Sequence, residues 1–146
     1  MYAKPQADAI ESDLQPLVGG KLITRLSKYD TNPANPIINT RAFGEDPADV
    51  GRMVAAEVRG LQQHGMLATA KHFPGHGDTG TDSHLALPVI GSSWARLDSV
   101  ELVPFRAAIA AGVDVVMSAH IALPGIDAGQ LRPGTVAPNI LTGILR

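Results

Sequence analysis

The sequence predicts an α/β fold in which parallel strands alternate with helices. Apolar residues recur at helical spacing over residues 46–65 and 98–111, and short apolar runs of strand length occupy residues 66–72 and 113–119. The order is therefore helix, strand, helix, strand, followed by a last helix near the end of the chain. This alternation is typical of βα units whose strands lie side by side in a parallel sheet.

The first predicted helix begins at Asp46-Pro47. Asp46 can cap the helix, and proline suits the first helical position because its missing N–H needs no partner there. Apolar side chains then fall on one face at Val50, Val54, Val58 and Leu61. Gly65 is expected to end the helix.

The remaining elements follow in the same manner. Met66 to His72 is a strand candidate, and Asp98 to Ala111 is a helix candidate in which Leu102, Phe105 and Ile109 recur at helical spacing. Val113 to Ala119 is an almost continuous apolar run, which predicts a parallel strand buried on both faces. The last helix is expected to begin at Pro138.

The N-terminal part carries weaker patterns. Residues 1–28 contain only a short mixed run from Lys21 to Leu26, so we treat them as a segment separate from residues 29–146. Asn, Pro and Thr dominate residues 29–44, which predicts an ordered irregular loop that contains Arg41.

Composition excludes several classes of function. The 146 residues carry a formal net charge of −2 without a Lys/Arg cluster, and six aromatic residues leave little for base stacking, so we expect no nucleic-acid partner. No apolar run approaches the ~20 residues of a membrane span, and the first 15 residues lack the apolar stretch of a signal peptide. We therefore expect a soluble cytoplasmic protein. The absence of cysteine leaves His, Asp, Glu, Lys and Ser for any chemistry.

Residues 71–84, KHFPGHGDTGTDSH, hold three histidines, two aspartates and a lysine in fourteen positions. Pro74 breaks helical hydrogen bonding, and Gly75, Gly77 and Gly80 allow positive φ, so we expect a shaped loop that presents polar side chains. The loop follows one predicted strand, and His120 follows the next. Functional groups of parallel α/β folds gather at such carboxyl ends.

Asp82 and His84 are spaced for proton transfer. A carboxylate can hold one imidazole nitrogen while the other faces a substrate, and histidine titrates near neutral pH. The alternative is a surface histidine beside a turn aspartate. Lys71 and His72 can hydrogen-bond substrate hydroxyls with Arg41 as a planar donor; the alternative is a lysine lying over apolar surface and a core histidine.

A metal site is a further alternative for the loop. His72, His76, Asp78 and His84 could hold zinc, but the helical H-E-x-x-H spacing is absent and Pro74 prevents a helix. We therefore expect no metal and no cofactor. Outside the loop, His64 suits the C-terminus of the first helix and His120 suits packing.

KHFPGHGDTGTDSH followed by LALP resembles the signature of glycoside hydrolase family 3, in the branch that contains the bacterial β-N-acetylhexosaminidases. The segments NPANPIINTRAFGEDP and ELVPFRAAIAAGVDVVMSAHIALP resemble the family in the same order. The resemblance covers about residues 30–146. It implies that residues 29–146 form a partial (β/α)8 TIM-type barrel.

The resemblance also implies a retaining hydrolase with a covalent glycosyl-enzyme intermediate. His84 would be the general acid/base, Asp82 would assist it, and Arg41, Lys71 and His72 would bind the sugar in the −1 subsite. The expected substrate is a terminal N-acetylglucosaminide in a glycan or muropeptide. A β-glucosidase-like member of the family is the alternative substrate class.

The family carries its aspartate nucleophile on a later strand, which would lie beyond Arg146. A complete barrel of this type takes about 250 residues. We therefore expect this chain to be inactive alone, and we expect an incomplete barrel to self-associate through its uncovered surfaces. A noncatalytic sugar-binding fragment and a metal-dependent hydrolase remain alternative functions.

Overall fold

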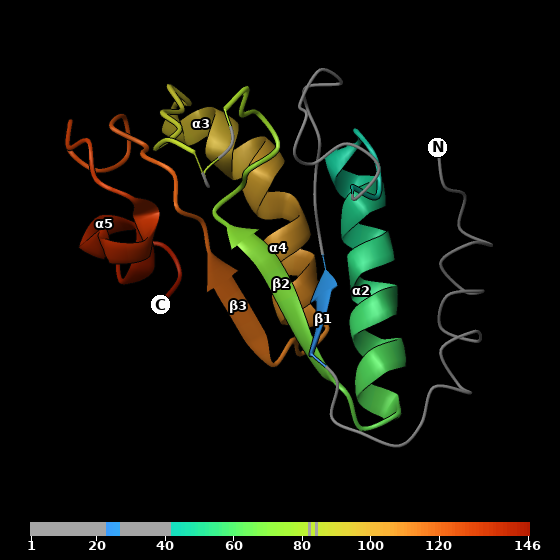
Figure 1. The fold of residues 1–146 in the computed structure, drawn as a ribbon. Coiled ribbons are helices and arrows are strands. Elements are labelled where there is room, and N and C mark those ends of the chain that lie inside the picture. The colour runs from blue at the N-terminus through green and yellow to red at the C-terminus, as the bar shows by residue number, and fades with distance from the viewer. Residues whose placement is uncertain (1–22, 27–41, 82, 84) are drawn as a thin grey trace.

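The computed structural model describes residues 23–26, 42–81, 83 and 85–146. Three parallel strands form one sheet in the order β1-β2-β3, and the long helices α2 and α4 pack beside it (Figure 1). The strands are β1 Ile23–Leu26, β2 Leu67–Phe73 and β3 Val115–Ser118. The helices are α2 Pro47–Gln63, α3 Trp94–Arg96, a π-helical turn Leu97–Glu101, α4 Leu102–Ala110, a 3-10 turn Gly134–Val136 and α5 Pro138–Leu141. The parallel α/β class predicted from the sequence is confirmed. In the described ranges, no helix is both long enough and apolar enough to cross a membrane.

Strand β1 is an addition to the elements that the sequence predicts. It runs parallel to β2, with Ile23 opposite Leu67 and Leu26 opposite Ala70. Its sequence, ITRL, mixes polar and apolar residues over only four positions, so no periodicity marks it as a strand. Backbone pairing to β2 brings this part of the chain into the same sheet as the loop.

Helix α2 matches its prediction. The Asp46 carboxylate accepts hydrogen bonds from the backbone N–H groups of Ala48 and Asp49, both at 2.9 Å. The predicted apolar face is fully buried at Val50, Val54, Val58 and Leu61. A Cβ atom at Gly51 would lie 3.2 Å from the Ala107 Cβ atom, so a glycine here lets α2 and α4 approach closely.

The second predicted helix is wrong at its start and on part of its face. It begins at Trp94 with Ser93 as the cap, so Asp98 lies inside the π-helical turn. Leu102 and Phe105 are buried as expected, but Ile109 is 53% exposed. Ala108 takes the buried position instead, and Ile109 lines an apolar cavity of about 180 Å³ with Trp94, Leu145 and other residues.

Strand β3 is not buried on both faces, which corrects a second expectation. Val116 packs against the core, whereas Val115 and Met117 are 39% and 42% exposed. In register, Val115 lies opposite Thr69 and Met117 lies opposite Lys71. This side of β3 is open in the part of the chain that the structure describes.

The buried carboxylate of Asp127 organises the segment that follows β3. Asp127 is fully buried, and its carboxylate accepts hydrogen bonds from Arg132 Nε at 2.5 Å and Nη2 at 2.9 Å, and from Asn139 Nδ2 at 2.9 Å. These hydrogen bonds, chiefly from Arg132, lower the pKa of the Asp127 carboxyl. The hydrogen bond from Asn139 thereby ties the loop to the start of α5.

Candidate active site

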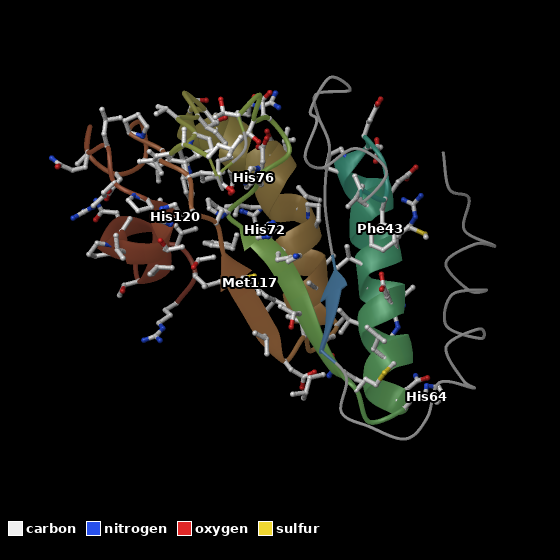
Figure 2. All side chains as sticks on the ribbon, viewed as in Figure 1. Phe43, His64, His72, His76, Met117 and His120 are labelled. Carbon is white, nitrogen blue, oxygen red and sulfur yellow. The ribbon has the colours of Figure 1, made fainter. Side chains whose placement is uncertain are left out.

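The loop predicted to carry function leaves the sheet at the carboxyl end of β2. His72, His76 and His120 lie at this end of the sheet, and His64 lies at the opposite end (Figure 2). His72 and His120, which come from the ends of two neighbouring strands, thus lie at the same end of the sheet (Figure 2), as the sequence predicted. Parallel α/β folds build their sites at this position because all the strands end there.

Phe73 fixes the start of the loop. Its carbonyl oxygen accepts a hydrogen bond of 2.7 Å from the Ala119 N–H, and its ring packs edge-on against Phe105 with ring centroids 5.2 Å apart. The pairing between β2 and β3 shifts by one residue between Lys71 and Phe73. The peptide bonds before His72 and Pro74 are both cis.

His76 lies at the centre of the loop and is 5% exposed. Its Nδ1 atom is 2.7 Å from Thr79 Oγ1, and its Nε2 atom is 3.2 Å from Ser83 Oγ. The His72 ring lies near it, edge-on, with ring centroids 5.7 Å apart. One imidazole thus connects the end of β2 with two hydroxyls of the loop.

Glu101 supports the loop from the π-helical turn. Its side chain is 6% exposed, and Arg96 lies between it and the loop, 3.3 Å from the Glu101 Oε1 atom and 3.9 Å from Asp78 Oδ2. Burial raises the pKa of the Glu101 carboxyl, although the Arg96 charge opposes the shift. The Glu101 Oε2 atom has no hydrogen-bond partner among the described residues.

Gly75 is the point where the loop touches Glu101. Its φ is +146°, as expected of a glycine in this loop, and an added Cβ atom would lie 2.6 Å from Glu101 Cγ and 2.8 Å from Glu101 Cβ. Gly80 does not take positive φ. Positive φ was expected at Gly75, Gly77 and Gly80, and of these three described glycines Gly75 alone takes it. The close contact with Glu101 explains why a glycine is needed at this position.

Gly75→Ala should displace the loop and lower the free energy of unfolding by about 1–3 kcal/mol, because the methyl group overlaps a buried side chain and the backbone is strained. Urea unfolding measures the change. Gly80→Ala is the matched control, since nothing lies within 4 Å of its Cβ position. Equal effects of the two substitutions would contradict the contact between Gly75 and Glu101.

The structure places two of the five predicted site residues. Lys71 is 8% exposed at the end of β2, and His72 follows it, half-buried beside His76. Arg41, Asp82 and His84 lie outside the described residues, so their roles stay predictions. Sequence reasoning considered His76 only as a metal ligand and did not consider Glu101, which is distant in the chain.

The other two histidines, His64 and His120, lie in different surroundings. His64 Nδ1 is 2.7 Å from the Gly60 carbonyl oxygen at the end of α2, as its position at the helix terminus suggested. His120 is exposed rather than packed in the core, and its Nδ1 is 3.1 Å from Thr135 Oγ1, which corrects the packing interpretation. The described residues contain no group of three or more His, Asp or Glu side chains that could hold a metal ion.

Comparison with known proteins identifies the family. The family model described as the glycosyl hydrolase family 3 N terminal domain matches residues 28–146. The chain belongs to glycosyl hydrolase family 3. The resemblance inferred from the loop motif is confirmed, and the family's barrel explains the parallel βα units.

Individual members of glycosyl hydrolase family 3 agree with this assignment. The chain is 35% identical to the β-hexosaminidase A of Pseudoalteromonas piscicida over 100% of its own length and 26% of the relative's. It is 47% identical to the β-N-acetylglucosaminidase/β-glucosidase of Cellulomonas fimi over 84% of its length and 22% of the relative's.

A solved family 3 structure is also similar, the β-N-acetylglucosaminidase of Paenibacillus sp. str. FPU-7, with a TM-score of 0.85 and 44% identity. It matches over 96% of this chain and 26% of that chain. The chain therefore spans about a quarter of the length of these relatives.

Proposed function

We propose that this chain supplies the sugar-binding and proton-transfer groups of a retaining β-N-acetylhexosaminidase that acts on terminal N-acetylglucosaminides. One observation carries the proposal: buried Lys71 and half-buried His72 lie among the last three residues of β2, directly before the loop that contains Asp82 and His84. The names of the hexosaminidase relatives and of the Paenibacillus structure support this substrate class.

In the proposed reaction, His84 acts first as an acid and then as a base. The imidazolium gives its proton to the glycosidic oxygen as the bond to C1 breaks, and a carboxylate nucleophile bonds to C1. The neutral imidazole then takes a proton from the water that releases the sugar. Asp82 would hold the imidazole and stabilise its charged form. We assign the nucleophile to the part of the relatives that this chain does not span.

Lys71, His72 and Arg41 are proposed to bind the sugar hydroxyls, with a glycan or muropeptide as the natural source of the N-acetylglucosamine. An ammonium group and an imidazole at a strand end are strong donors to hydroxyl oxygens. A second candidate is hydrolysis of β-glucosides, because the Cellulomonas fimi relative is named for both activities.

The purified chain should show no turnover of a chromogenic N-acetyl-β-glucosaminide or β-glucoside, because the covalent step needs a nucleophile as well as an acid/base. It should still bind N-acetylglucosamine in a calorimeter. Turnover that disappears in His84→Ala would contradict the proposal that this chain carries the acid/base but not the nucleophile. Turnover of the β-glucoside alone would favour the second candidate.

We also propose that the open side of β3, with exposed Val115 and Met117, is covered in solution by a second copy of the chain. An edge strand with exposed apolar side chains is a site of association. Sedimentation equilibrium measures the mass, and a monomer at all concentrations would contradict the proposal.

A further inference from the structure

Both ring nitrogens of His76 contact hydroxyl groups of the loop. Nδ1 contacts Thr79 Oγ1 at 2.7 Å and Nε2 contacts Ser83 Oγ at 3.2 Å. Both His76 and Thr79 are buried, at 5% and 2% exposure. A buried imidazole with two short contacts has a defined tautomer, because each nitrogen must match the role of its partner.

The Thr79 hydroxyl decides which nitrogen carries the proton. It donates its single hydrogen to the His76 carbonyl oxygen, at 3.0 Å. The contact between Thr79 Oγ1 and Nδ1 then needs its hydrogen from the ring, so Nδ1 is protonated. In the neutral ring Nε2 is therefore an acceptor, and the Ser83 hydroxyl donates to it.

Several described positions near Ser83 are exposed. Asp78, Gly80 and Thr81 are exposed, and Leu85, two residues after Ser83, is 86% exposed. The hydrogen bond to buried His76 thus connects Ser83 to the packed part of the loop. Ser83 is bonded in the chain to Asp82 on one side and to His84 on the other.

We propose that His76 is a positioning residue for the proton-transfer pair: as a neutral imidazole protonated on Nδ1, it holds Ser83 and with it the chain that bears Asp82 and His84. This inference rests on the proposed function for the role of the pair. The hold on Ser83 itself depends only on the contacts of His76.

Two substitutions separate the two contacts. In His76→Gln, the amide oxygen can take the place of Nε2 and accept from Ser83, whereas in His76→Asn, the amide N–H₂ can take the place of Nδ1 and donate to Thr79. We expect the Gln variant to keep the Ser83 backbone rigid, with an NMR order parameter of about 0.85 as in the unsubstituted chain. In His76→Asn and Ser83→Ala it should fall below about 0.6.

Nitrogen-15 shifts of the His76 ring test the tautomer directly, with Nδ1 protonated and Nε2 bare as the expected result. Affinity for N-acetylglucosamine should fall about tenfold in His76→Asn and be retained in His76→Gln, the loss expected for one buried hydrogen bond. A proton on Nε2, or equal Ser83 order in the Gln and Asn variants, would overturn the inference. If the unsubstituted chain binds no sugar, the proposed function fails, while the order parameters and ring shifts still decide the hold on Ser83.

Discussion

Lys71→Met is expected to weaken the binding of N-acetylglucosamine by about 10- to 100-fold, the effect of losing a charged hydrogen-bond donor. Lys71 is 8% exposed near the end of β2, the strand that leads into the loop, and the proposed function assigns its ammonium group to the sugar hydroxyls. Methionine keeps the length of the stem and removes the charge. Isothermal titration calorimetry measures the affinity.

Stability measurements separate a binding role of Lys71 from a structural one. Removing one member of a buried polar contact destabilises a fold, so the free energy of unfolding of Lys71→Met is measured by urea unfolding, and the affinity is compared under conditions where the variant is folded. Arg52→Met, at an exposed position of α2, is the matched control and should leave the affinity unchanged. Unchanged affinity in Lys71→Met would remove Lys71 from the proposed sugar site.

Glu57→Gln should stabilise the chain in a pH-dependent manner. Glu57 lies on α2 one turn from buried Met53 and one turn from buried Leu61, and burial raises the pKa of its carboxyl from 4.5 to about 7. The folded chain therefore keeps a proton that the unfolded chain releases between these values. The free energy of unfolding decreases as pH rises through this window, by at most roughly 3 kcal/mol.

The glutamine variant stays neutral at every pH, so it avoids this loss. We expect little difference from the unsubstituted chain at pH 4 and a gain of at most roughly 3 kcal/mol at pH 8, measured by urea unfolding. Glu45→Gln, at an exposed position, is the control and should show no such trend. A gain of equal size at both pH values would contradict the burial of Glu57 as its cause.

The sequence predicted those parts of the fold that have strong local signals. Asp46 and Pro47 marked the start of α2, and its four apolar residues share one face, so helix and buried face both follow from spacing. Val115 and Met117 look identical in sequence to fully buried strand residues, because apolar content does not reveal whether a second layer covers them. Ile109 was misplaced because spacing does not show which flank of an apolar helix face is covered: Ala108 is buried in α4, whereas Ile109 lines the apolar cavity.

The candidate site also has parts that the sequence predicted and parts that it did not. Lys71 and His72 were predicted because they come at the end of a predicted strand that leads into a polar loop. Positive φ at Gly75 was predicted because glycine has no side chain to prevent it. The support by Glu101 could not be predicted, because it lies 26 residues after Gly75 and touches it only in the folded chain. The role of His76 depends on which hydroxyls approach its two nitrogens, and spacing alone does not determine that.

NMR titration of the chain with N-acetylglucosamine, with glucose in parallel, tests the central claim most directly. We predict that N-acetylglucosamine shifts the resonances of Lys71, His72 and residues 75–85 at the carboxyl end of β2, and that glucose binds more weakly. Resonances of α2 and of His64, at the opposite end of the sheet, should not move. No shifts with either sugar, or shifts away from this loop, would contradict the claim that the chain carries the sugar-binding groups.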